Sequence, residues 1–159
     1  MIRIAICDDE TVMCEKLKMT VSSILEKWKE NYQIVCHPSA AGLLWGPLDC
    51  DLLFLDIRMP GIDGMRAAGG LREQGFSGEL IFVTAFSEYM PDAFEVEAAD
   101  YLEKPVDRER LERTLKRVLQ RLRRDREESF CIRTANWCRT IPFGEIYYCE
   151  VINRKIFVH

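Results

Sequence analysis

Hydrophobic and polar positions follow two alternating periods through the first two thirds of the chain. Short apolar runs, typical of buried strands, occur at Ile2–Cys7, Gln33–Cys36, Leu52–Leu55, Leu80–Val83 and Tyr101–Glu103. Between these runs, apolar residues recur at spacings of three and four, as on one face of an amphipathic helix. We predict helices over Glu10–Glu30, Ala40–Trp45, residues 64–74, Glu88–Glu97 and Asp107–Arg124, with a break after the second at Gly46-Pro47.

Five repeats of a strand followed by a helix indicate a parallel sheet covered on both faces, because parallel neighbours need crossover connections. We predict an α/β fold of the flavodoxin-like (βα)5 class for residues 1–122. The strand order 2-1-3-4-5 is taken over from that class and is not deduced from this sequence. Gly69-Gly70 is unexpected inside a helix, where each glycine costs about 1 kcal/mol relative to alanine.

The pattern changes after residue 128. Short β-branched and aromatic runs, with a turn near Asn153, predict strands at Phe130–Arg133, Arg139–Pro142, Ile146–Val151 and Lys155–Val158. We therefore expect residues 129–159 to be the start of an all-β segment, joined to the first domain by a solvated linker at Arg123–Glu128.

Charge is divided unevenly along the 159 residues. Positions 1–106 hold 18 acidic and 9 basic residues, whereas positions 107–159 hold 8 and 13, for a net charge of −4. This asymmetry is compatible with a cation site in the first part and an anionic partner for the second, or with a solvated basic helix face.

Composition also limits the class of protein. Seven cysteines, an odd number without a Cys-x-x-Cys pair, argue against a disulfide framework or a zinc site. The apolar stretches are too short to span a bilayer, and the acidic N-terminal segment does not resemble a secretory signal. We expect a cytoplasmic protein with reduced cysteines and no membrane partner.

Polar residues follow four of the predicted strands. Asp8 and Asp9 come after the first, Asp56 after the third, Thr84 after the fourth and Lys104 after the fifth. The carboxyl ends of parallel strands lie along one edge of the sheet, where ligands bind at the point of strand-order reversal. We therefore expect these side chains to form one site.

Three carboxylates this close repel one another unless a cation is bound. Oxygen ligands without His or Cys favour Mg²⁺, which also binds phosphoryl oxygens. A carboxylate is a known nucleophile for phosphoryl transfer, and we assign that role to Asp56. Lys104 would supply a positive charge and Thr84 a hydrogen bond to the phosphoryl group.

Each residue alone also has an ordinary structural explanation. Asp9 or Glu10 could cap the following helix, Thr84 could be a strand-end threonine, and Lys104-Pro105 could be a surface turn. The arrangement of all of them in chain order, at four strand ends, favours a site.

The motifs resemble the response regulator receiver domain of two-component signalling. They read Ile-Cys-Asp8-Asp9-Glu10, Leu-Phe-Leu-Asp56-Ile-Arg-Met-Pro60-Gly61-Ile-Asp63-Gly64, Phe-Val-Thr84-Ala85 and Asp-Tyr101-Leu-Glu-Lys104-Pro105. The resemblance implies that Asp56 accepts a phosphoryl group from the histidine of a sensor kinase. It implies Mg²⁺ ligation by Asp9, Asp56 and the Arg58 backbone carbonyl, with Asp8 acting through water.

The resemblance also implies a switch. Thr84 would move towards the phosphoryl group, Tyr101 would turn into the vacated space, and the reshaped surface would form a homodimer. A half-exposed strand aromatic is the plain alternative for Tyr101. Residues 129–159 resemble the opening of a LytTR-type DNA-binding domain, truncated here, so we expect DNA binding and transcriptional regulation only from a full-length form.

Other functions of the same fold fit these residues less well. A dehalogenase-type phosphatase needs a second aspartate two residues after the nucleophile, and Arg58 occupies that position, so a turnover enzyme is not expected. A flavodoxin-like cofactor site needs a Ser-, Thr- and Gly-rich loop where Asp8-Asp9-Glu10 stands. A pure interaction module would not need Thr84 and Lys104. A stand-alone phosphorelay receiver without DNA output stays open.

Overall fold

The computed structural model describes residues 1–45, 48–127, 129–133, 138–142, 146–152 and 155–158. Its strands are β1 Ile2–Cys7, β2 Tyr32–His37, β3 Leu52–Leu55, β4 Glu79–Thr84, β5 Asp100–Glu103, β6 Ser129–Arg133, β7 Cys138–Pro142, β8 Cys149–Ile152 and β9 Lys155–Val158. Its α-helices are α1 Thr11–Lys27, α2 Gly64–Glu73 and α3 Arg108–Glu127, and its 3₁₀ turns are η1 Ala40–Leu43, η2 Ser87–Tyr89 and η3 Asp92–Phe94. The chain forms two compact units, Met1–Lys116 and Arg117–His159.

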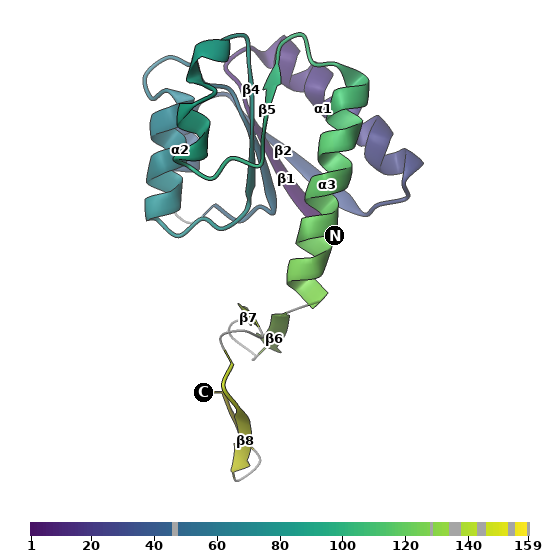
Figure 1. The fold of residues 1–159 in the computed structure, drawn as a ribbon, viewed down its shortest axis with the longest axis vertical. Helices are drawn as coiled ribbons and strands as arrows, with labels where there is room; N and C mark the ends of the chain where they lie inside the picture. The colour runs from purple at the N-terminus through teal and green to yellow at the C-terminus, as the bar shows by residue number, and fades with distance from the viewer. Residues whose placement is uncertain (46–47, 128, 134–137, 143–145, 153–154, 159) are drawn as a thin grey trace. The chain divides into compact units, whose positions relative to one another are not determined.

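The first unit is built on a five-stranded parallel sheet in the order β2-β1-β3-β4-β5. Helix α2 covers one face, and α1 and the first part of α3 cover the other (Figure 1). The predicted fold class and strand order are confirmed. The reversal of strand order falls between β1 and β3, which both end at the edge that carries the aspartates.

The sheet is buried on both faces. All four residues of β3 are fully buried, and five of six in β4 have little exposure. Successive strand residues point to opposite faces, so a strand covered on both sides reads as a continuous apolar run. On one face, side chains of the central strands form a cluster with α2, η1 and Tyr101. Because burial on both faces gives continuous apolar runs, the strands could be predicted from the sequence.

The helix predicted over Glu88–Glu97 is wrong. Two 3₁₀ turns, η2 and η3, stand there instead. Pro91 lies between them, and proline removes the backbone N–H that a continuous helix would need at that position. Glu97 ends the segment with a φ of 53°, outside the helical region. The break at Gly46-Pro47 lies outside the described residues.

The two glycines inside α2 have different surroundings. A Cβ on Gly70 would lie 3.2 Å from a terminal methyl of Leu44, which follows η1. A Cβ on Gly69 would meet no atom within 4 Å. Close packing against Leu44 therefore accounts for Gly70, and nothing in the structure explains Gly69.

The second unit contains two antiparallel pairs, β6 with β7 and β8 with β9. Strand β8 begins at Cys149, three residues later than the strand predicted from Ile146, and the turn near Asn153 lies outside the described residues. The predicted linker at 123–128 is helical as far as Glu127. No helix in the described ranges combines the length and apolar character needed to cross a membrane.

Candidate functional site

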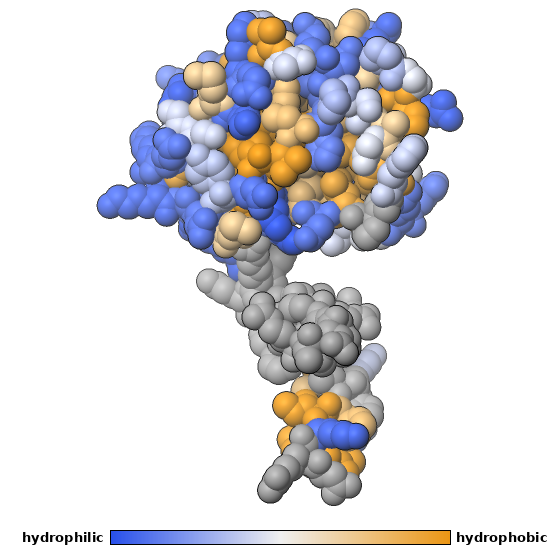
Figure 2. Space-filling model, turned by 180° about the vertical axis from the view of Figure 1, so that it is seen from behind, coloured by the Kyte–Doolittle hydropathy of each residue, from blue (hydrophilic) through white to orange (hydrophobic). Residues whose placement is uncertain are grey.

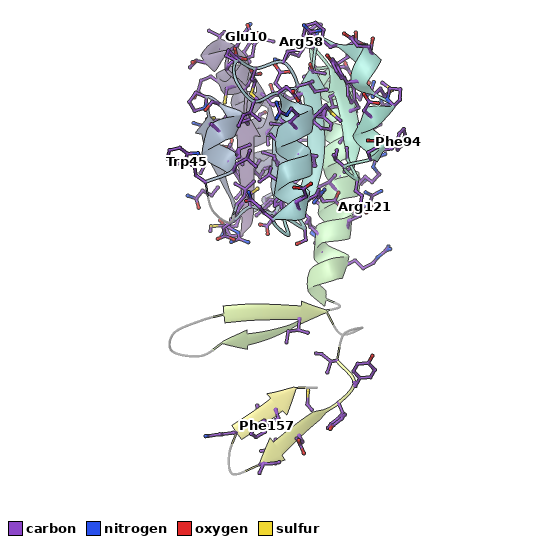
Figure 3. The ribbon with its side chains drawn as sticks, turned by 90° about the vertical axis from the view of Figure 1, so that its left-hand side faces the viewer. Glu10, Trp45, Arg58, Phe94, Arg121 and Phe157 are labelled. Atoms are coloured by element: carbon purple, nitrogen blue, oxygen red, sulfur yellow. The ribbon has the colours of Figure 1, made fainter. Side chains whose placement is uncertain are left out.

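Backbone hydrogen bonds fix the ends of neighbouring strands relative to one another. The Asp56 N–H donates to the Cys7 carbonyl at 2.9 Å, and the Lys104 N–H donates to the Thr84 carbonyl at 2.8 Å. The sheet itself therefore holds four strand ends along one edge. In Figure 3, Glu10 after β1 and Arg58 after β3 lie at this same end of the unit.

Three aspartates converge at this edge. One carboxylate oxygen from each of Asp8, Asp9 and Asp56 lies within 4.8 Å of the others. Asp8 and Asp56 are buried and Asp9 is exposed. Asp8 does not serve as a free surface acid, because its Oδ1 accepts a 2.9 Å hydrogen bond from the Glu10 N–H. Glu10 takes the position before α1, and its side chain makes no capping hydrogen bond.

Lys104 joins two of these carboxylates. Its Nζ lies 2.6 Å from Asp56 Oδ2 and 2.8 Å from Asp8 Oδ2, and its side chain is 8% exposed. Burial lowers the pKa of Lys104, but the hydrogen bonds with Asp56 and Asp8 outweigh it and raise the pKa overall. The ammonium therefore stays charged at neutral pH, between two buried carboxylates.

The charges at this edge leave an anionic excess. Burial raises the pKa of Asp8 above its ordinary value, and the hydrogen bond from Lys104 counters this only in part. Three carboxylates and one ammonium carry a formal charge of about −2 when ionised. An all-oxygen donor set with this charge fits one Mg²⁺, which prefers such ligands. Among the described residues, no other group of three or more His, Cys, Asp or Glu side chains brings its ligand atoms within 4.8 Å of one another.

Thr84 lies at the end of β4 with its side chain fully buried. Its Oγ1 makes no hydrogen bond to any described residue. A buried hydroxyl without a partner costs about 1–3 kcal/mol, so such groups are uncommon in native proteins. An anionic ligand at the neighbouring Lys104 would supply the missing acceptor.

Tyr101 is coupled to the same strand. It pairs with Phe82 in the sheet, so Thr84 lies two residues further along the same face. The Tyr101 side chain is 5% exposed, and its hydroxyl donates to the Phe86 carbonyl. Burial is the main cause that raises its pKa to about 12. Tyr101 is therefore a buried residue, which rules out the half-exposed alternative.

The Arg58 side chain contacts the segment that follows β4. Its guanidinium carbon lies 4.5 Å from the Phe86 ring centroid and 6.0 Å from that of Tyr89. Glu88 Oε1 lies 3.9 Å from Arg58 Nη2. These contacts connect the loop after Asp56 with the segment that follows Thr84. Sequence patterns gave no signal for this pairing, because it joins two loops.

Gly64 belongs to the Asp56 motif, but the sequence patterns assigned it no role at the site. A Cβ at Gly64 would stand 2.0 Å from the backbone oxygen of Asp56. Its N–H also donates to the Ile57 carbonyl at 2.7 Å. The start of α2 therefore packs directly against the backbone of the predicted nucleophile. A glycine at the first position of a helix, just after a motif residue, was the available signal.

The family model for the response regulator receiver domain matches residues 4–116. The transcriptional regulatory protein BtsR of Escherichia coli K12 is 39% identical over 123 residues, which cover 76% of this chain and 49% of BtsR. The chain thus spans about half the length of the curated relatives that it matches.

Solved structures give the same picture of the fold. The response regulatory domain of protein mrkE from Klebsiella pneumoniae matches with a TM-score of 0.69 and 25% identity, covering 77% of this chain and 98% of that one. The response regulator protein TrrA from Thermotoga maritima, solved in complex with Mg²⁺-BeF, matches with a TM-score of 0.57 and 29% identity, covering 74% and 99%.

Proposed function

Because the chain belongs to the response regulator receiver family, we propose that Asp56 accepts a phosphoryl group from the histidine of a sensor kinase. The observation that carries the proposal is the Lys104 ammonium, held between Asp56 and Asp8 beside a third aspartate. The protein is then a self-modifying signalling module and not a turnover enzyme. We place this activity in the cytoplasm.

Mg²⁺ is part of this proposal. Asp9 and Asp56 would ligate the ion directly, the Arg58 backbone carbonyl would add a third protein ligand, and Asp8 would act through water. When bound, the ion neutralises charge on the phosphoryl oxygens during transfer. The acidic donor set supports this assignment, as does the relative TrrA, whose structure was solved with Mg²⁺-BeF.

The reaction itself requires little proton transfer from the protein. A carboxylate oxygen of Asp56 forms a new bond to phosphorus, and the bond from phosphorus to the donor nitrogen breaks. Lys104 moves its hydrogen bond from Asp56 Oδ2 to a phosphoryl oxygen and stabilises the negative charge there. The Thr84 hydroxyl donates to another phosphoryl oxygen and so gains a partner.

The direct test is phosphorylation by a small donor. The protein incubated with acetyl phosphate and Mg²⁺ should gain the mass of one phosphoryl group, and Asp56→Asn should gain none. Asp63→Asn is the matched control, because Asp63 is a nearby acid that caps α2 and asparagine caps equally well. Phosphorylation of Asp56→Asn would contradict the proposal. So would an unaltered chain that gains no phosphoryl group, whether Mg²⁺ is present or not.

The signal would leave the site through Thr84 and Tyr101. Because Tyr101 is already buried, we propose that phosphorylation stabilises its present position and the surface beside it, in place of a large inward turn. That surface would then form a homodimer. Thr84→Ala should still accept phosphate but dimerise less, and Thr84→Ser, which keeps a hydroxyl, should dimerise as the unaltered chain does. Equal phosphate-dependent dimerisation of Thr84→Ala and the unaltered chain, measured by light scattering, would argue against this route.

The output is proposed to be transcriptional regulation by a full-length form that binds DNA. Residues 129–159 would be the first strands of its LytTR-type domain, after the receiver at 1–122 and the linker at 123–128. The relative BtsR, named a transcriptional regulatory protein, supports this output. The alternative, a phosphorelay receiver without DNA output, is favoured by the self-contained first unit. Promoter binding that depends on phosphorylation would decide between them.

A further inference from the structure

A concave pocket opens beside the acidic cluster, between α1 and the segment that follows β5. Its cavity volume is about 430 Å³, within the range of small-molecule sites. Apolar side chains form most of its wall. They include Met13 and Leu17 from α1, Val83 from β4, and Val106 and Leu111 near the start of α3. The phosphoacceptor chemistry described above does not use this space.

The pocket is continuous with the site. Asp8 and Lys104 line both, and Lys104 Nζ lies 2.6 Å from Asp56 Oδ2. A donor whose phosphoryl group contacts Lys104 would, in this proposal, place its leaving group beside the apolar wall that Lys104 borders. Lys16 also lines the pocket, and its ammonium complements a leaving group that departs as an anion.

We propose that this pocket binds the acyl group of small acyl phosphates, so that the protein prefers donors with longer aliphatic acyl chains. The inference rests on the proposed phosphoacceptor function. In the reaction, a carboxylate oxygen of Asp56 forms a bond to phosphorus while the bond from phosphorus to the acyl oxygen breaks. The bonding electron pair leaves with the carboxylate, and no proton, oxidant or reductant is needed.

The test is a homologous series of donors, namely acetyl, propionyl and butyryl phosphate. Their leaving carboxylates have nearly equal basicity, so chain length changes little except the contact with the pocket. The rate constant for phosphorylation of Asp56, followed by intact mass at subsaturating donor, should rise about threefold to fourfold per methylene buried. From acetyl to butyryl phosphate the expected gain is about tenfold.

Two variants make the pocket wall more polar without a large change in volume. Met13→Gln and Val106→Thr should reduce the gain from acetyl to butyryl phosphate towards onefold. Met65→Gln is the matched control, because Met65 is a half-buried methionine of α2 that does not line the pocket. It should keep the full tenfold gain.

The outcomes separate this inference from the function on which it rests. If acetyl phosphate modifies Asp56 but the series is flat, the pocket does not receive the acyl group and this inference is wrong. An unchanged gain in both pocket variants overturns it equally. If no donor modifies Asp56, the phosphoacceptor function itself fails. A gain that falls in the two pocket variants and persists in Met65→Gln supports the pocket.

Discussion

Val21 in α1 is fully buried, whereas Val151 in β8 is 71% exposed, and the same contrast separates Phe54 from Phe157. In Met1–Lys116, helices cover both faces of a five-stranded sheet, so strand residues on either face find apolar neighbours. In the second unit, Val151 pairs with Ile156, and both side chains are exposed. Figure 2 shows hydrophobic residues at the surface of the β8–β9 pair. Two-stranded pairs bury little by themselves.

This contrast shows which part of the chain can be interpreted alone. The first unit closes its own core and orders a site at its edge, so its chemistry follows from its own residues. The apolar side chains of β8 and β9 have no such enclosure in the described residues. Their role depends on what packs against them.

The largest expected difference concerns thiol reactivity. Burial, followed by the nearby Asp8 and Asp56, raises the pKa of Cys7 to about 12, whereas Cys149 is exposed. At pH 8 only about one Cys7 thiol in ten thousand is ionised, and the thiolate is the reactive form. Iodoacetamide should therefore alkylate Cys149 at least about a hundredfold faster, as measured by peptide mapping. In urea the two rates should converge, and equal rates in the native protein would break the comparison.

Truncation of a phenylalanine should affect stability very differently in the two units. Phe54→Ala should lower the free energy of unfolding of the first unit by about 3–5 kcal/mol, because it leaves a cavity in a fully buried strand. Phe157→Ala should change that quantity by less than about 0.5 kcal/mol, since its side chain is 42% exposed. Urea titration followed by circular dichroism measures both, and similar losses would contradict the assignment of separate cores.

Glycine substitutions test whether close packing in the first unit extends to the site. Gly64→Ala should cost about 1–3 kcal/mol and slow the modification of Asp56, because its Cβ would overlap the Asp56 backbone. Gly69→Ala, in the same helix, should instead stabilise by up to about 1 kcal/mol, because its Cβ meets open space. Thermal melts and acetyl phosphate labelling give the two readouts. A harmless Gly64→Ala would show that the Asp56 loop can shift.

The smallest expected effect comes from removing the second unit's strands. A chain ending at Glu127 should keep the stability of the first unit within about 0.5 kcal/mol. Its rate of phosphorylation should match that of the longer chain. A large loss of either property would show that β6–β9 support the first unit.

The sequence predicted the strands and the edge that carries the acids because both follow from short-range patterns, whereas the strand order was taken over from a fold class. Apolar runs such as Leu52–Leu55 are buried on both faces, and polar residues mark where such runs end. The failed helix over Glu88–Glu97 shows the limit of periodicity, because Pro91 interrupts the backbone pattern that spacing alone suggested.

Contacts between segments distant in sequence could not be predicted in the same way. The position of Lys104 between Asp8 and Asp56 depends on three strands, and the contact of Arg58 with Phe86 depends on two loops. The pocket beside Asp8 also appears only when α1 and the segment after β5 are placed together. These contacts and this pocket depend on the tertiary fold and leave no local pattern in the sequence.

The buried Thr84 hydroxyl has an energetic consequence for signalling. The unmodified protein is held in a state that is less stable than it would be with a purely apolar side chain at this position. A phosphoryl group on Asp56 would give this hydroxyl an acceptor, so part of the stability of the modified protein would come from removing that cost. Under the proposed function, this cost in the unmodified state would favour the modified one, and Thr84→Val would be more stable when unmodified but less responsive to phosphorylation.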